Sequence, residues 1–171
     1  MLQPTVRRTW APKGETPRQK SWDRHDRLSA ISAITISPKR CRLGLVFQVH
    51  RENIRSDHVV TFLRLVHRRL GNGLLVVMDR LGAHRAAVRR LQEAGADWLD
   101  VEWLPAYAPD LNPDEQVWNH AKYSDLANFL PEDLDHLERS LCDSLTKQCR
   151  SPDLLRSYCE HAKLKLPRKV R

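Results

Sequence analysis

Two carboxylates stand where an α/β protein can carry out chemistry. Asp79 follows Leu74–Met78, an uninterrupted apolar run that is typical of a strand buried on both faces. Glu115 lies in the first turn of a helix expected to begin at Asn112, after the next strand. Open α/β sheets bind ligands beyond the carboxyl ends of their strands, so both acids can meet at one edge. Such carboxylates suit Mg²⁺, and two ions about 3.5–4 Å apart would promote phosphoryl transfer.

Each carboxylate also has a structural interpretation. Asp79 can stabilise the turn after its strand, as aspartates commonly do. Glu115 stands three residues after Asn112, which is the spacing of a capping box, and Pro113 occupies the favoured first helical position. Spacing by itself favours these structural roles over a catalytic one. The residues alone therefore predict a basic α/β domain with a candidate carboxylate site.

The remaining elements are those that would position this site. Leu28–Ile36 and Leu43–Val49 have strand periodicity and are joined by a short polar turn, so they predict a hairpin. Ser56 is expected to cap a helix whose apolar face extends to Leu70. We expect further strands at 74–78 and 101–104, and helices at 84–94, 112–123, 134–150 and from 152 onward. This order predicts a mixed α/β sheet with helices on its faces.

Composition narrows the class of protein. The chain has 171 residues, of which 41% are hydrophobic, and this suits a single compact domain. We assign residues 1–150 to that domain and residues 151–171 to a short helix and a basic tail. Lys and Arg number 29 against 21 Asp and Glu, and the net charge of +8 fits a polyanionic partner such as nucleic acid. No stretch approaches the roughly 20 apolar residues of a membrane span, so no membrane partner is expected.

Three segments carry a more specific signal: Arg7–Gly14 (RRTWAPKG), Val76–Asp79 (VVMD) and Leu104–Trp118 (LPAYAPDLNPDEQVW). They resemble the DDE endonuclease domain of mariner-related bacterial insertion-sequence transposases. The resemblance extends from about Val6 to about Lys147, and the last segment is the most specific part of it. It implies an RNase H-like fold and metal-dependent cleavage and transfer of DNA strands, with Mg²⁺ or Mn²⁺ at a two-metal site.

The resemblance also implies roles for individual residues. Asp79 would be the second acid of the catalytic triad and Glu115 the third, and both would hold metal; the 35 residues between them are close to the family's spacing. In the family the first acid lies on a strand just before the Arg-Arg-Thr-Trp segment, and this chain begins too late to include it. Asp23 and Asp26 look like solvated charges, not replacements. We therefore expect an RNase H-like mixed sheet, flanked by helices, that lacks its first, central strand and is inactive alone.

DNA is the expected partner, both as the element's ends and as the target. Arg7, Arg8 and Lys13, interleaved with Trp10, can contact the DNA backbone, although a solubilising charged loop explains them equally well. His84 can approach the site or a phosphate, but a histidine at a helix N-terminus is more often simply exposed. An upstream transposase segment or an intact transposase is a further expected partner.

Two other functions fit the sequence less well. One is a non-enzymatic, basic DNA-binding remnant of a transposase that interferes with an intact copy. The other is an RNase H-like nuclease acting on RNA–DNA hybrids, and the Leu-Asn-Pro-x-Glu string argues against it. In each case we expect the protein in the bacterial cytoplasm, associated with the nucleoid when bound to DNA.

Overall fold

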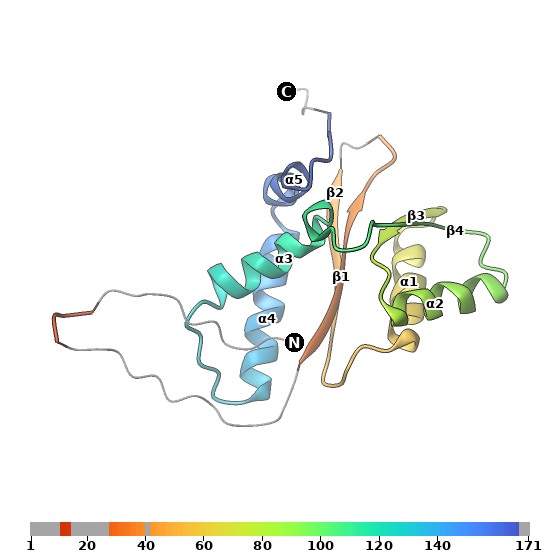
Figure 1. Cartoon of the computed structure of the whole chain (residues 1–171). Coiled ribbons are helices and arrows are strands. Elements are labelled where there is room, and N and C mark those ends of the chain that lie inside the picture. The colour runs from red at the N-terminus through yellow and green to blue at the C-terminus, as the bar shows by residue number, and fades with distance from the viewer. Residues whose placement is uncertain (1–10, 15–27, 40–41, 168–171) are drawn as a thin grey trace.

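The computed structural model describes residues 11–14, 28–39 and 42–167. The first two strands form the predicted hairpin, in which β1 (Ser29–Ile36) pairs with β2 (Leu43–His50) in antiparallel orientation. In this register Ala33 lies opposite Val46. Figure 1 shows this hairpin between two groups of helices, α1 and α2 on one side and α3, α4 and α5 on the other. Both faces of the hairpin are thus covered, as its largely apolar strands require.

The elements after the hairpin alternate between helix and strand. They are α1 (Ser56–Leu70), β3 (Leu74–Met78), α2 (Gly82–Glu93) and β4 (Leu99–Trp103). The strands β3 and β4 are parallel, with Leu74 opposite Leu99 and Met78 opposite Trp103. The chain then forms η1 (Pro109–Leu111), α3 (Asp114–His120), the π-helical turn η2 (Ala121–Asp125), α4 (Leu134–Cys149) and α5 (Pro152–His161).

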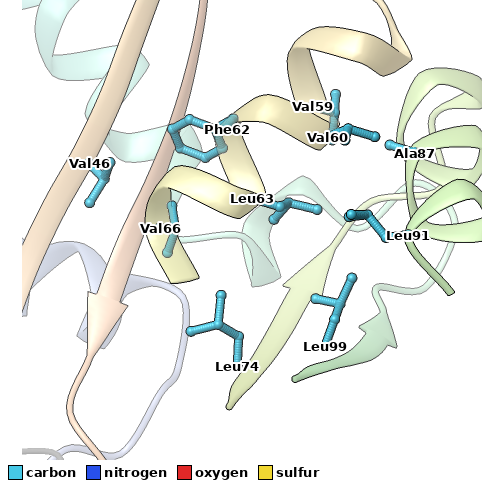
Figure 2. Close-up of a cluster of buried hydrophobic side chains, with 10 residues drawn as sticks. All are labelled: Val46, Val59, Val60, Phe62, Leu63, Val66, Leu74, Ala87, Leu91 and Leu99. Carbon is cyan, nitrogen blue, oxygen red and sulfur yellow. The ribbon is translucent and has the colours of Figure 1, made fainter. Parts of the chain in front are cut away.

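One core joins the two pairs of strands through α1. Buried side chains of α1, Phe62 and Val66 among them, share a cluster with Val46 of β2 and with Leu74 and Leu99 of the parallel pair, as Figure 2 shows. Because these side chains bury apolar area from both strand pairs, α1 holds the hairpin and the β3–β4 pair together. The described strands nevertheless form two separate two-stranded sheets, β1–β2 and β3–β4, without hydrogen bonds between them.

A second core covers the other face of the hairpin. Leu45 of β2 packs there with Val117 of α3, Leu141 and Leu145 of α4, and Leu155 of α5. One face of the parallel pair has no such cover within the described residues, where Leu75 and Val77 of β3 are 68% and 57% exposed. The prediction that this strand is buried on both faces is therefore wrong for the described part of the chain. Within the described ranges no strand links the hairpin to β3.

The start of α1 departs from the prediction. Ser56 is the first helical residue, and the capping position belongs to Arg55, whose backbone is extended. His58 makes this possible because its Nδ1 accepts a hydrogen bond of 3.0 Å from the Arg55 N–H. The predicted cap at Ser56 is therefore wrong. Leu70, expected on the apolar face, is exposed in the last turn, just before the left-handed Gly71.

The C-terminal helices belong to the second core. Leu155 and Tyr158 of α5 are buried there, and the Tyr158 hydroxyl donates to Oε1 of the buried Gln148 at 3.0 Å. The division of the chain at residue 150 stays a prediction. In the part of the chain that the structure describes, no helix has the length and apolar character needed to cross a membrane.

Candidate active site

The end of β3 and the segment after β4 leave the same sheet edge. The Leu104 N–H donates to the Met78 carbonyl oxygen at 2.9 Å, so the pairing of β3 with β4 continues to the last residue before Asp79. The chain after Leu104 then runs through η1 into α3, which carries Glu115. The topology therefore brings Asp79 and the segment that leads to Glu115 to the carboxyl end of the parallel strands, where α/β folds bind ligands.

Asp79 combines a structural contact with an open side. Its Oδ1 accepts from the Leu81 N–H at 3.1 Å, which is the turn-stabilising bond expected of an aspartate after a strand. The same oxygen lies 2.6 Å from Nδ1 of His84. The Asp79 side chain is still 44% exposed. The structure thus brings together two of the predicted residues, Asp79 and His84, and leaves the carboxylate accessible.

Glu115 is exposed and is not used in helix capping. Its N–H donates to the Asn112 carbonyl oxygen at 3.2 Å, while Oδ1 of Asn112 accepts from the Asp114 N–H at 3.1 Å. The Asn112 N–H, which a capping box would direct to Glu115, donates instead to the Pro109 carbonyl oxygen at 2.9 Å. The capping-box interpretation of Glu115 is therefore not realised, and its carboxylate remains open to solvent.

The donor chemistry of these two residues suits a hard divalent cation. Mg²⁺ and Mn²⁺ prefer carboxylate oxygens and leave further positions for water and substrate phosphate. Asp79 and Glu115 each present an accessible carboxylate, whereas the ring nitrogen of His84 is engaged with Asp79. No group of three or more His, Cys, Asp or Glu residues suited to a metal ion occurs within the described ranges. The described residues thus offer a partial ligand set.

Asp114, next to Glu115, is partly buried, and its carboxyl group, which the sequence analysis missed, is shielded from solvent. Its Oδ2 accepts from the Ser32 hydroxyl at 2.7 Å and from Nε1 of Trp118 at 3.1 Å. Its Oδ1 is buried and has no hydrogen-bond partner. The spacing of Asp114 and Trp118, four residues apart on one helix, is the only sign of this cluster in the sequence.

Burial controls the ionisation of Asp114. Loss of hydration raises the pKa of this carboxyl to about 6, although the hydrogen bonds from Ser32 and Trp118 act in the opposite direction. The negative charge of Glu115 adds to the increase. Because Ser32 belongs to β1, the cluster fastens the first turn of α3 to the hairpin and so fixes the backbone of Glu115.

Most of the predicted DNA-contacting residues lie outside the described residues, namely Arg7, Arg8 and Trp10. The two acids expected to be solvated charges, Asp23 and Asp26, also lie outside them. Lys13 is exposed in a short turn that precedes Gly14. A role for these residues in DNA binding stays a prediction.

Comparison with known families decides the class of protein. The family model for the DDE superfamily endonuclease matches residues 1–138 of the 171. The chain belongs to the DDE superfamily of endonucleases. A search of curated proteins found no match.

Solved structures show the fold of this DDE endonuclease domain. The Mos1 strand transfer complex is similar with a TM-score of 0.60 and 15% identity, over 95% of this chain and 48% of the Mos1 chain. The Mos1 transposase paired-end complex with the left transposon end gives 0.59 and 14%, over the same shares of the two chains. This chain therefore spans about half the length of those proteins. Its fold is the RNase H-like fold, as the sequence resemblance implied.

Proposed function

We propose that this DDE endonuclease domain acts in DNA transposition, by hydrolysis of a phosphodiester at an element's end and attack of the freed 3′-hydroxyl on target DNA. The observation that carries the proposal is the placement of Asp79 after β3, with an accessible carboxylate, in a chain whose match to the family model spans the positions of Asp79 and Glu115. DNA as substrate is supported by the net charge of +8 and by the DNA complexes of the similar Mos1 structures.

Asp79 and Glu115 are the proposed ligands of Mg²⁺ or Mn²⁺. When bound, such ions supply activation of water or of the 3′-hydroxyl and stabilise the leaving oxygen. The contact between His84 and Asp79 holds the Asp79 carboxylate in one orientation, a role common to residues that support metal ligands. The Asp114 cluster does the same for the first turn of α3, so that Glu115 is presented from a fixed helix.

A third carboxylate belongs to the proposed site and would come from outside the described residues. The unlinked strand pairs β1–β2 and β3–β4 leave backbone edges to which a further strand can add. We propose that an upstream transposase segment supplies that strand and its acid. Without it, we expect little strand cleavage from the described site.

Cleavage of an element-end oligonucleotide tests the proposal. The chain is co-expressed with the upstream segment and assayed with Mg²⁺ or Mn²⁺, and Asp79→Asn and Glu115→Gln should each abolish cleavage. Asp97→Asn is the matched control, because this aspartate is exposed after α2, away from the β3 end, and should leave cleavage unchanged. Continued inactivity of the reconstituted protein, or full activity of the Asp79 variant, would refute the proposal.

The second candidate is a non-enzymatic DNA-binding remnant that competes with an intact transposase. The basic net charge favours this candidate, because it suits DNA binding. The described residues also supply two acids of the three that the proposed catalytic site needs. Under this alternative Asp79→Asn has no effect on inhibition of transposition by the chain, since only DNA binding matters. For either function we propose a location in the bacterial cytoplasm.

A further inference from the structure

Tyr107 has a conformation and an exposure that packing does not explain. It lies between β4 and η1, its side chain is fully exposed, and its φ of 57° is in the left-handed region. For a residue other than glycine this conformation costs about 1–2 kcal/mol, because Cβ approaches the neighbouring carbonyl oxygen. Residues held in such a strained state, without compensating burial, occur mainly at functional sites.

The backbone fixes Tyr107 near the candidate active site. Three residues before it, the Leu104 N–H is bonded to Met78, which directly precedes Asp79. After it, the Leu111 N–H donates to the Ala108 carbonyl oxygen at 3.2 Å and closes the 3-10 turn that leads to Glu115. The tyrosine thus belongs to a short segment held at both ends, at the same sheet edge as Asp79.

The residue types on the segments that leave this sheet edge suit a nucleotide. Leu81 and Leu111, on the two segments that leave this edge, are exposed apolar side chains, and Arg80 next to Asp79 is an exposed cation. A phosphate suits the cation and the metal-binding carboxylates, whereas a base suits an exposed ring with apolar neighbours. A base paired within a duplex cannot present its face to a side chain, so the base must be unpaired or turned out of the helix.

We propose that Tyr107 is a stacking platform for one unpaired base of the DNA strand held at Asp79 and Glu115. This inference rests on the proposed function, since it takes DNA as the ligand of the site. The fully exposed side chain leaves the ring accessible to a base. The ring would hold the strand next to the reacting phosphate and favour DNA ends with frayed or single-stranded bases.

Binding of a fluorescent oligonucleotide tests the platform without any need for catalysis. The probe is a duplex with a short single-stranded end that carries 2-aminopurine, whose emission falls when the base stacks; a blunt duplex of the same sequence is the comparison. We expect the full chain to quench the probe and to bind it more tightly than the blunt duplex. Tyr107→Ala should remove the quenching and weaken binding by about 5- to 150-fold, the loss expected for one stacked base.

Three further variants separate stacking from other effects. Tyr107→Phe keeps the ring and should bind as the wild type does, whereas Tyr107→Leu keeps only apolar bulk and should behave as Tyr107→Ala. Leu70→Ala, which removes an exposed apolar side chain at the end of α1, is the matched control and should bind normally. Equal quenching by the wild type and Tyr107→Leu overturns the stacking role while the proposed function stands. Failure of the wild type to bind either duplex overturns both.

Discussion

Replacement of the buried Asp114 by asparagine gives a prediction with a magnitude set by the structure. Burial raises the pKa of this carboxyl from 3.8 to about 6. The folded protein therefore holds the proton more tightly than the unfolded chain. At a pH below the unfolded pKa, the carboxyl is neutral in both states and does not lower the free energy of unfolding. As the pH rises from the unfolded pKa to the folded pKa, the folded state becomes progressively less stable. The difference between the folded and the unfolded pKa corresponds to a loss of about 3 kcal/mol in the free energy of unfolding, at about 1.36 kcal/mol for each pKa unit. This loss is fully expressed above pH 6.

Urea unfolding between pH 3 and pH 7.5 measures this effect. The free energy of unfolding of the wild type should fall by about 3 kcal/mol relative to that of Asp114→Asn as the pH rises through this range. The change with pH is the informative quantity, because the asparagine introduces an amide group where Oδ1 has no partner, and this adds a cost that is constant with pH. Asp97→Asn, at an exposed position, is the control and should follow the wild type. Parallel curves for the wild type and Asp114→Asn would refute the burial argument.

Three further predictions concern single residues around the site. Tyr107→Gly should raise the free energy of unfolding by about 1 kcal/mol, measured in urea, because glycine adopts a φ of 57° without strain; a loss of stability would show that the conformation is not strained. Ser32→Ala removes a hydrogen bond to the Asp114 carboxylate and should lower the free energy of unfolding by about 1–3 kcal/mol. The loss should be larger at pH 7, where the carboxylate is ionised, than at pH 4.5, and an unchanged melting temperature would count against the cluster. His84→Ala frees Asp79 and should weaken Mn²⁺ binding by about 10-fold in a calorimetric titration, whereas unchanged affinity would mean that this contact has no positioning role.

The secondary structure followed from local patterns. The strands expected from the alternating apolar residues of the hairpin and from the apolar run of β3 were confirmed with little change in their bounds. The period of apolar residues indicates the type of element, but it did not predict the exposed face of β3, where Leu75 and Val77 lie. The RNase H-like fold did not follow from periodicity, which predicted only a mixed α/β sheet; it was predicted from the resemblance carried by the residues around Asp79 and Glu115.

Features that depend on distant contacts were missed. The Asp114 carboxyl accepts a hydrogen bond from Ser32, 82 residues earlier in the chain, and no local pattern indicates such a pairing. The left-handed φ of Tyr107 was not anticipated either, since glycine and asparagine are the residues that favour this region. The cap of α1 was assigned to Ser56 from residue preference, whereas His58 decides the start of the helix.

Metal binding by the chain tests the proposed site most directly, because Asp79 and Glu115 must share one cation there. Mn²⁺ affinity is measured by calorimetry for the wild type, Asp79→Asn, Glu115→Gln and the double variant. We predict that each single change weakens binding strongly and that the double variant binds hardly more weakly than either, since the two losses concern one ion. Losses that simply add, or wild-type affinity in either single variant, would contradict a shared site.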